Sequence, residues 1–113
     1  MKVVYFVTES GRRPAEEFVK SLNVRSKEKF FSAVELLEEF GKELPSPHAK
    51  YIGDEVFELR FEGVEGSVRV LYFFFDGEKA VLTNGFIKKS NKTPKNEKET
   101  AVNRRQIYFQ THS

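Results

Sequence analysis

Hydrophobic and polar side chains alternate along residues 55–93, and this pattern predicts three β-strands joined by two tight turns. The two faces of the first strand carry Phe57, Leu59 and Phe61 on one side and Glu58, Arg60 and Glu62 on the other. The second strand is expected at 67–75 and the third at 79–88, where β-branched and aromatic residues are dense. Glycine and acidic residues at 63–66 mark the first turn, and Asp76-Gly77 signals a two-residue hairpin. We therefore predict a three-stranded antiparallel meander.

The first forty residues predict one strand and two helices. Residues 2–8 are β-branched and aromatic, which favours a strand that pairs with the meander. Pro14 suits the first position of a short helix, and Asn23 can cap a second, longer helix that ends at Gly41. Apolar residues recur in the longer helix at intervals of three and four, at Phe30, Ala33, Val34, Leu37 and Phe40. The two helices should form a hairpin that lays an apolar stripe on the sheet.

The remaining segments complete the expected architecture. Residues 44–53 contain two prolines and are predicted to be a loop. Residues 95–109 follow Pro94 and are predicted to form a helix with few apolar positions, which favours light packing. The order β-α-α-β-β-β-α indicates an α+β fold, with a mostly antiparallel sheet, the helix hairpin on one face and a C-terminal helix. The expected core residues are Phe30, Val34, Leu37, Leu59, Phe61, Val70 and Tyr72.

Composition narrows the class of protein. A chain of 113 residues suits a single domain covering residues 1–113, with a sizeable core. The absence of cysteine excludes disulfides and thiolate chemistry. The chain has no apolar run near 18 residues, and its first ten residues are too polar for a signal peptide. We therefore expect a soluble, cytoplasmic protein with no membrane partner.

Positive charge is concentrated near the C-terminus. The formal net charge is only +2, but residues 88–105 carry a net +5. The basic residues of this segment are Lys88, Lys89, Lys92, Lys95, Lys98, Arg104 and Arg105. Localised positive charge on a small domain favours a polyanionic partner, most often nucleic acid. A solvated basic helix is the alternative interpretation.

Standard catalytic motifs are absent, and what remains is a set of polar residues on strands. There is no phosphate-binding glycine loop, no serine in a nucleophile elbow, and only two histidines without clustered carboxylates to hold a metal. Hairpin pairing should bring Glu58, Arg60 and Arg69 onto one exposed sheet face, joined by Lys88 or Lys89 at the end of the next strand. Arginines hold phosphate oxygens, and a carboxylate can accept a proton. Cross-strand ion pairs on a solvated face are the alternative interpretation.

Three stretches resemble the HigB branch of the RelE/ParE superfamily of toxins: FELR at 57–60, VRVLYF at 68–73 and NGFIKKSNKTP at 84–94. The opening FVTESGRRPAEEFVKSL and the segment ELPSPHAKYI are also similar to that family. The resemblance implies a RelE-like fold and a small cytoplasmic toxin of a toxin–antitoxin pair. Such a toxin would cleave messenger RNA on the ribosome by attack of the 2′-hydroxyl, without metal or cofactor, and a helix-turn-helix antitoxin would neutralise it.

The resemblance also assigns roles to residues. The implied catalytic residues are Arg60, Arg69 and Lys88, with Arg69 stabilising the charge of the transition state. Glu58 joins them as a catalytic candidate because of its expected place on the same sheet face. The implied RNA-binding residues are Lys50, Lys89, Lys92 and Tyr108, and the basic character of residues 88–105 adds Arg104 and Arg105 as RNA-binding candidates. Members of the family often carry histidine before the Gly-Phe pair, where this chain has Asn84. Proton transfer would then fall to Glu58, Lys50 or a lysine of the cluster.

Two other functions stay open at the level of sequence. The ParE branch of the superfamily inhibits DNA gyrase, an activity that needs no catalytic face. The other possibility is a module that binds RNA or the antitoxin without cleaving RNA. In that case Asn84 marks a catalytic position that this chain has lost. The KK-x-x-KT cluster at 88–93 and the pair Arg60 and Arg69 favour the endoribonuclease.

Overall fold

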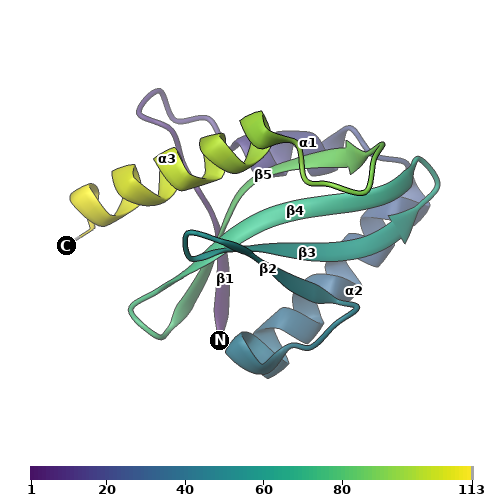
Figure 1. Ribbon diagram of the computed structural model, residues 1–113, viewed down its shortest axis with the longest axis horizontal. Coiled ribbons are helices and arrows are strands. Elements are labelled where there is room, and N and C mark those ends of the chain that lie inside the picture. The colour runs from purple at the N-terminus through teal and green to yellow at the C-terminus, as the bar shows by residue number, and fades with distance from the viewer. Residues whose placement is uncertain (113) are drawn as a thin grey trace.

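The computed structural model describes residues 1–112. Within this range, three α-helices pack on the two faces of one five-stranded sheet (Figure 1). Ser113, the last residue of the predicted domain, lies outside the described residues. The strands are β1 (Lys2–Tyr5), β2 (Ala49–Gly53), β3 (Val56–Gly63), β4 (Gly66–Phe75) and β5 (Lys79–Lys88). The helices are α1 (Pro14–Lys20), α2 (Val24–Phe40) and α3 (Lys95–Thr111), with a 3-10 turn at Gly41–Glu43. The predicted α+β class is confirmed.

The sheet has the order β1-β5-β4-β3-β2. β1 runs parallel to β5, and the other three neighbouring pairs are antiparallel, so the sheet is mixed but mostly antiparallel. The predicted meander is confirmed as β3, β4 and β5, because period-two alternation and the turn residues are local signals. In the β3–β4 hairpin Arg60 lies directly opposite Arg69.

The prediction of a loop over residues 44–53 is wrong for its second half, which forms β2. This short strand pairs with β3 at the edge of the sheet, and Lys50 lies opposite Glu58. Its side chains do not alternate in burial, since most are exposed or half-buried. The strand therefore depends on backbone hydrogen bonds to β3, which the pattern of side chains does not reveal.

The helix hairpin covers one face of the sheet, as predicted. In Figure 1, α1 and α2 lie behind the sheet and α3 crosses in front of it. Phe30 and Leu37 of α2 pack with Leu59, Val70 and Tyr72 in one buried cluster. Val34 and Phe61, also expected in the core, are only half-buried. Phe61 lies two residues beyond Leu59, the last β3 residue that pairs with β2, so its edge of the sheet is open.

The C-terminal helix covers the second face with few apolar side chains. Ala101 packs with Val56, Leu71 and Phe86, and Tyr108 packs with Phe73. Hydrogen bonds supplement these contacts, since the guanidinium of Arg104 donates to the carbonyl of Thr83 at 2.9 Å. Across residues 1–112, none of the helices has the length and apolar character that a membrane span requires.

Candidate functional site

A polar cluster lies on the side of the sheet that faces α3, next to the N-terminal end of that helix. It is built from Glu58 and Arg60 of β3 and Arg69 of β4. The Nε atoms of both arginines lie 3.8 Å from Oε1 of Glu58. Alternation along β3 and the direct pairing of Arg60 with Arg69 bring these side chains together. The prediction that the three share one sheet face is confirmed.

Two of the three residues are buried and Arg60 is half-buried, which corrects the expectation of a solvated sheet face. Glu58 is 0% exposed and Arg69 is 6% exposed. The segment that connects β5 to α3 contacts the cluster, because the hydroxyl of Thr93 donates a hydrogen bond to Oε2 of Glu58. Sequence alternation identifies the face on which a side chain lies, but it does not show that a later segment covers that face.

Three polar atoms of the cluster have no hydrogen-bond partner within residues 1–112: Oε1 of Glu58 and the Nε atoms of Arg60 and Arg69. Separations of 3.8 Å between them are too long for hydrogen bonds. Arg69 also donates from Nη1 to the carbonyl of Val68 at 2.9 Å. Because both Nε atoms are buried beside Glu58, an incoming acceptor such as a phosphate oxygen would first meet the part of the Arg60 guanidinium side chain that stays exposed.

Further cations surround the cluster. Lys88 lies opposite Ser67 in the β4–β5 ladder. Its pKa is lowered chiefly by burial; the charge of Glu58 acts against this, and the charges of Arg69, Arg60 and Lys50 lower the pKa further. Burial also lowers the pKa of Arg69, with the charge of Arg60 in the same direction and those of Glu58 and Glu62 opposing it. Mutual repulsion among these cations favours binding of an anion.

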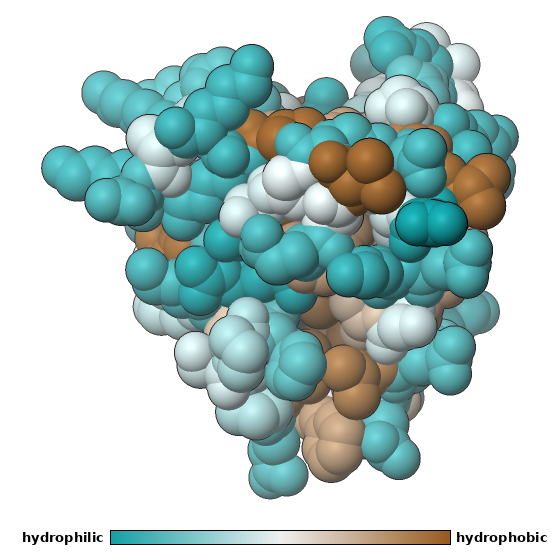
Figure 2. All heavy atoms as spheres, turned by 90° about the vertical axis from the view of Figure 1, so that its right-hand side faces the viewer, coloured by the Kyte–Doolittle hydropathy of each residue, from teal (hydrophilic) through white to brown (hydrophobic). Residues whose placement is uncertain are grey.

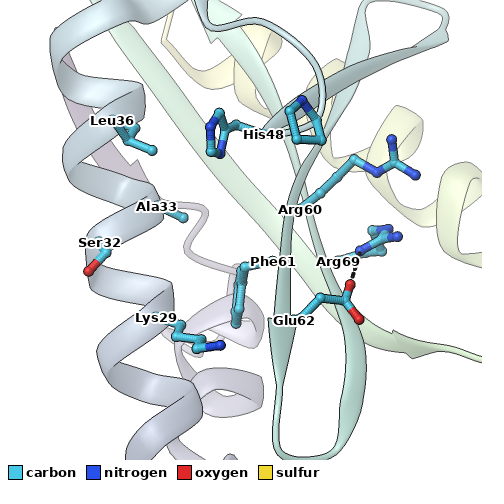
Figure 3. A pocket seen from close by; sticks show the side chains of 10 residues that line it. Lys29, Ser32, Ala33, Leu36, His48, Arg60, Phe61, Glu62 and Arg69 are labelled. Atoms are coloured by element: carbon cyan, nitrogen blue, oxygen red, sulfur yellow. Dashed lines mark ion pairs between the residues drawn. The ribbon is translucent and has the colours of Figure 1, made fainter.

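Two hollows meet at the arginine pair. The first, the α2–β3 groove, has a volume of about 540 Å³ and is lined by Lys29, Ser32, Ala33, Leu36, Pro47, His48, Arg60, Phe61, Glu62 and Arg69 (Figure 3). The second, the lysine hollow, has a volume of about 370 Å³ and is lined by Arg60, Ser67, Arg69, Lys88, Lys89, Ser90 and Asn91. Figure 2 looks toward the end of the molecule where the β3–β4 hairpin lies, and its surface there is mainly hydrophilic.

The structure places only part of the predicted RNA-binding set near this site. Lys89 lines the lysine hollow, and Lys50 is opposite Glu58. Lys92 is exposed in the segment before α3, next to Thr93. These lysines and the catalytic candidates therefore gather at one end of the sheet.

Arg104, Arg105 and Tyr108 line neither hollow and are held in internal contacts along α3. Arg104 donates to the Thr83 carbonyl, and the guanidinium of Arg105 lies 4.4 Å from the centre of the Phe109 ring. Tyr108 is buried against Phe73. The positive charge of residues 88–105 is thus divided between the site and the packing of α3, and an RNA contact by these three residues stays a prediction.

Sequence reasoning missed the role of Thr93 and the surroundings of Asn84. The Lys-Thr-Pro string at 92–94 drew attention to the segment that contains Thr93, but it did not identify Glu58 as the hydrogen-bond partner of Thr93. The amide of Asn84 donates to the carbonyl and to Oε1 of Glu97, at 3.2 and 2.9 Å. Asn84 therefore attaches α3 to β5, a structural use that was not visible in the sequence.

Comparison with models of protein families finds one that matches residues 17–106, described as phage derived protein Gp49-like (DUF891). The match covers most of the chain, and the family is one of RelE/ParE-like toxins in toxin–antitoxin systems. A search of curated proteins found no match. The predicted resemblance is confirmed for the superfamily, whereas the HigB branch stays a prediction.

Proposed function

The chain belongs to the Gp49-like family of RelE/ParE-like toxins, and on that premise we propose that it is a metal-independent endoribonuclease that cleaves messenger RNA on the ribosome. The observation that carries the proposal is the pair Arg60 and Arg69, which lie on either side of the buried Glu58 carboxylate and line both hollows. Paired guanidinium groups bind the oxygens of a phosphodiester through charge-assisted hydrogen bonds. We propose the HigB branch of the superfamily for this chain, on the motifs that resemble it.

In the proposed reaction the ribose 2′-hydroxyl attacks the adjacent phosphorus. A bond between the 2′-oxygen and phosphorus forms while the bond from phosphorus to the 5′-oxygen breaks, which leaves a 2′,3′-cyclic phosphate and a 5′-hydroxyl. Negative charge grows on the nonbridging oxygens in the transition state. We assign Arg69 to stabilise that charge, because its guanidinium is held in place by burial, and Arg60 to support it.

The reaction also removes one proton from the nucleophile and adds one to the leaving oxygen. We assign these transfers to Lys88 and Lys50. A lowered pKa increases the neutral fraction of Lys88, and a neutral amine can accept the proton of the 2′-hydroxyl. Glu58 is fully buried and accepts a hydrogen bond from Thr93, so it is better suited to hold the arginines in position than to exchange protons with RNA.

Replacement of Thr93 tests this positioning role. Thr93→Val keeps the shape but removes the hydroxyl, so the free energy of unfolding should fall by about 1.5–3 kcal/mol, the usual range for a hydrogen bond to a charged group. RNA binding should also weaken, because the segment that carries Lys89 and Lys92 loses its attachment to Glu58. Urea denaturation and RNA titration measure the two effects. Thr93→Ser retains the hydroxyl and should restore both; a serine variant no better than the valine variant would contradict the role.

A toxin of this family implies an antitoxin partner. We propose that the partner is a helix-turn-helix protein and that the toxin acts in the cytoplasm, where ribosomes and messages are found. Neutralisation could follow if the antitoxin covered the cationic end of the sheet, because RNA and an acidic protein segment would compete for the same charges.

Expression without antitoxin tests the proposed function. The wild-type chain should stop growth and translation, and messages recovered from the cells should carry new 5′ ends within coding regions. Arg69→Ala, produced to the same level, is the matched control and should leave messages intact. Supercoiling defects with intact messages would instead identify a gyrase inhibitor. Binding to ribosomes without new 5′ ends would identify a module that does not cleave.

A further inference from the structure

We propose that the α2–β3 groove binds a nucleobase of the RNA strand, next to the phosphate that Arg60 and Arg69 hold. This inference rests on the proposed function and adds a subsite to it. The groove lies between Lys29, Ser32 and Leu36 of α2 and the edge of β3 (Figure 3). Pockets of roughly 300–1,000 Å³ hold small-molecule ligands, so a groove of about 540 Å³ has room for one base and its ribose.

The two hollows on either side of the arginine pair differ in chemistry. Outside the arginines, the lysine hollow is lined by serine, asparagine and lysine side chains alone. The α2–β3 groove instead has an apolar wall formed by Ala33, Leu36, Pro47 and Phe61. A nucleic acid strand presents a charged backbone and flat apolar bases, and proteins bind the two with cationic grooves and with aromatic surfaces respectively. With a phosphate at the arginine pair, the backbone suits the lysine hollow and a base suits the groove.

The groove exists because β2 is short. Its pairing with β3 begins at Ala49, opposite Leu59, and the backbone N–H of Arg60 donates to the carbonyl of His48 at 2.9 Å. Beyond that point the edge of β3 is free of β2, and Phe61 is only half-buried. Figure 3 shows Phe61 directed toward α2, with Arg60 and Arg69 on the opposite side of the hairpin. A nucleotide held by the arginines can therefore reach Phe61 by passing over this free edge.

The rim of the groove can distinguish one base from another. His48 and Ser32 are exposed at the rim, and Glu62 lies beside the arginines. The imidazole of His48 and the carboxylate of Glu62 offer both donors and acceptors to the edges of a base, whereas Phe61 offers a ring surface that accepts any base. The inference therefore places the choice of cleaved sequence at His48 and Glu62 rather than at the lysines.

The test uses ribosomes programmed with a message that carries 2′-O-methyl groups at the mapped cleavage site, so that binding is measured without cleavage. Ser32→Trp fills the groove from an exposed position on α2, and Glu35→Trp is the control, since Glu35 is exposed on the same helix but does not line the groove. Ser32→Trp should weaken binding by about 5–150-fold, the range expected for loss of one stacked base. Glu35→Trp should bind as the wild type does, and melting curves should show both variants folded.

An abasic nucleotide on one or the other side of the cleavage site completes the cycle. At one of the two positions the abasic message should weaken wild-type binding by a similar factor, with no further loss in Ser32→Trp, because both changes remove the same contact. If Ser32→Trp and the abasic change weakened binding independently, or if Ser32→Trp bound as tightly as the wild type, the groove would not hold a base. The unmodified message, assayed in parallel, separates the two proposals: failure of the wild type to cleave it would overturn the proposed function itself.

Discussion

Replacing Arg69 with alanine is expected to slow single-turnover cleavage of a ribosome-bound message by about 10²–10³-fold, as loss of one donor to a developing oxyanion does. Arg69 is 6% exposed, and its guanidinium is fixed by a hydrogen bond to the Val68 carbonyl and by Glu58 and Glu62. The Arg69 guanidinium is therefore already oriented before the reaction begins, so it stabilises the negative charge that develops on the phosphate oxygens in the transition state. Saturating toxin and a rapid quench measure the chemical step apart from binding.

Loss of stability has to be separated from loss of catalysis in this variant. Arg69→Ala removes a buried partner of Glu58, and a buried carboxylate with fewer partners destabilises the fold. Glu58→Gln combined with Arg69→Ala removes the charge as well, so it should recover stability in urea denaturation without recovering the cleavage rate. A double variant that regained the rate would show that Arg69 acts only on folding.

Lys89→Ala is the matched control for the arginine. Lys89 is exposed and lines the lysine hollow, so it is expected to bind a backbone phosphate as a point charge. Its removal should reduce the log–log salt dependence of RNA binding by about 0.7, the value for one phosphate contact on a single strand, and leave the single-turnover rate nearly unchanged. If Arg69→Ala lost affinity but kept its rate, the assigned roles would be reversed.

Replacing Leu37 with alanine is expected to lower the free energy of unfolding by about 2–5 kcal/mol. Leu37 is fully buried in the cluster that joins α2 to β3 and β4, and the shorter side chain would leave a cavity there. Urea denaturation measures the change. Glu35→Ala alters an exposed position two residues earlier and should change stability by no more than about 0.5 kcal/mol. Equal effects of the two variants would contradict the packing of α2 on the sheet.

The same variant links the core to the site. α2 forms one wall of the α2–β3 groove through Lys29, Ser32 and Leu36, while Leu37 on its inner side packs on the sheet. A variant that folds with a repacked α2 should therefore also bind RNA less tightly than the wild type, even where the arginine pair is intact.

The features that the sequence determined by itself are those with a local physical cause. Alternation of period two and the turn residues at 63–66 and 76–77 determined the meander, and apolar spacing with caps at Asn23 and Gly41 determined α2. Alternation also determined that Glu58, Arg60 and Arg69 share a face. The lysine-rich string after β5 marked the cationic end of the sheet.

Only the tertiary structure decided what surrounds those side chains. β2 forms because β3 offers it backbone hydrogen bonds, and its short length leaves the groove open at Phe61. Glu58 is buried, and its carboxylate accepts a hydrogen bond from Thr93, 35 residues later in the chain. Arg104 is basic and Tyr108 is aromatic, and side chains of both types bind RNA in other proteins. In this fold they attach α3 to the sheet. Burial and pairing of this kind depend on contacts between distant segments, and no pattern within one segment specifies them.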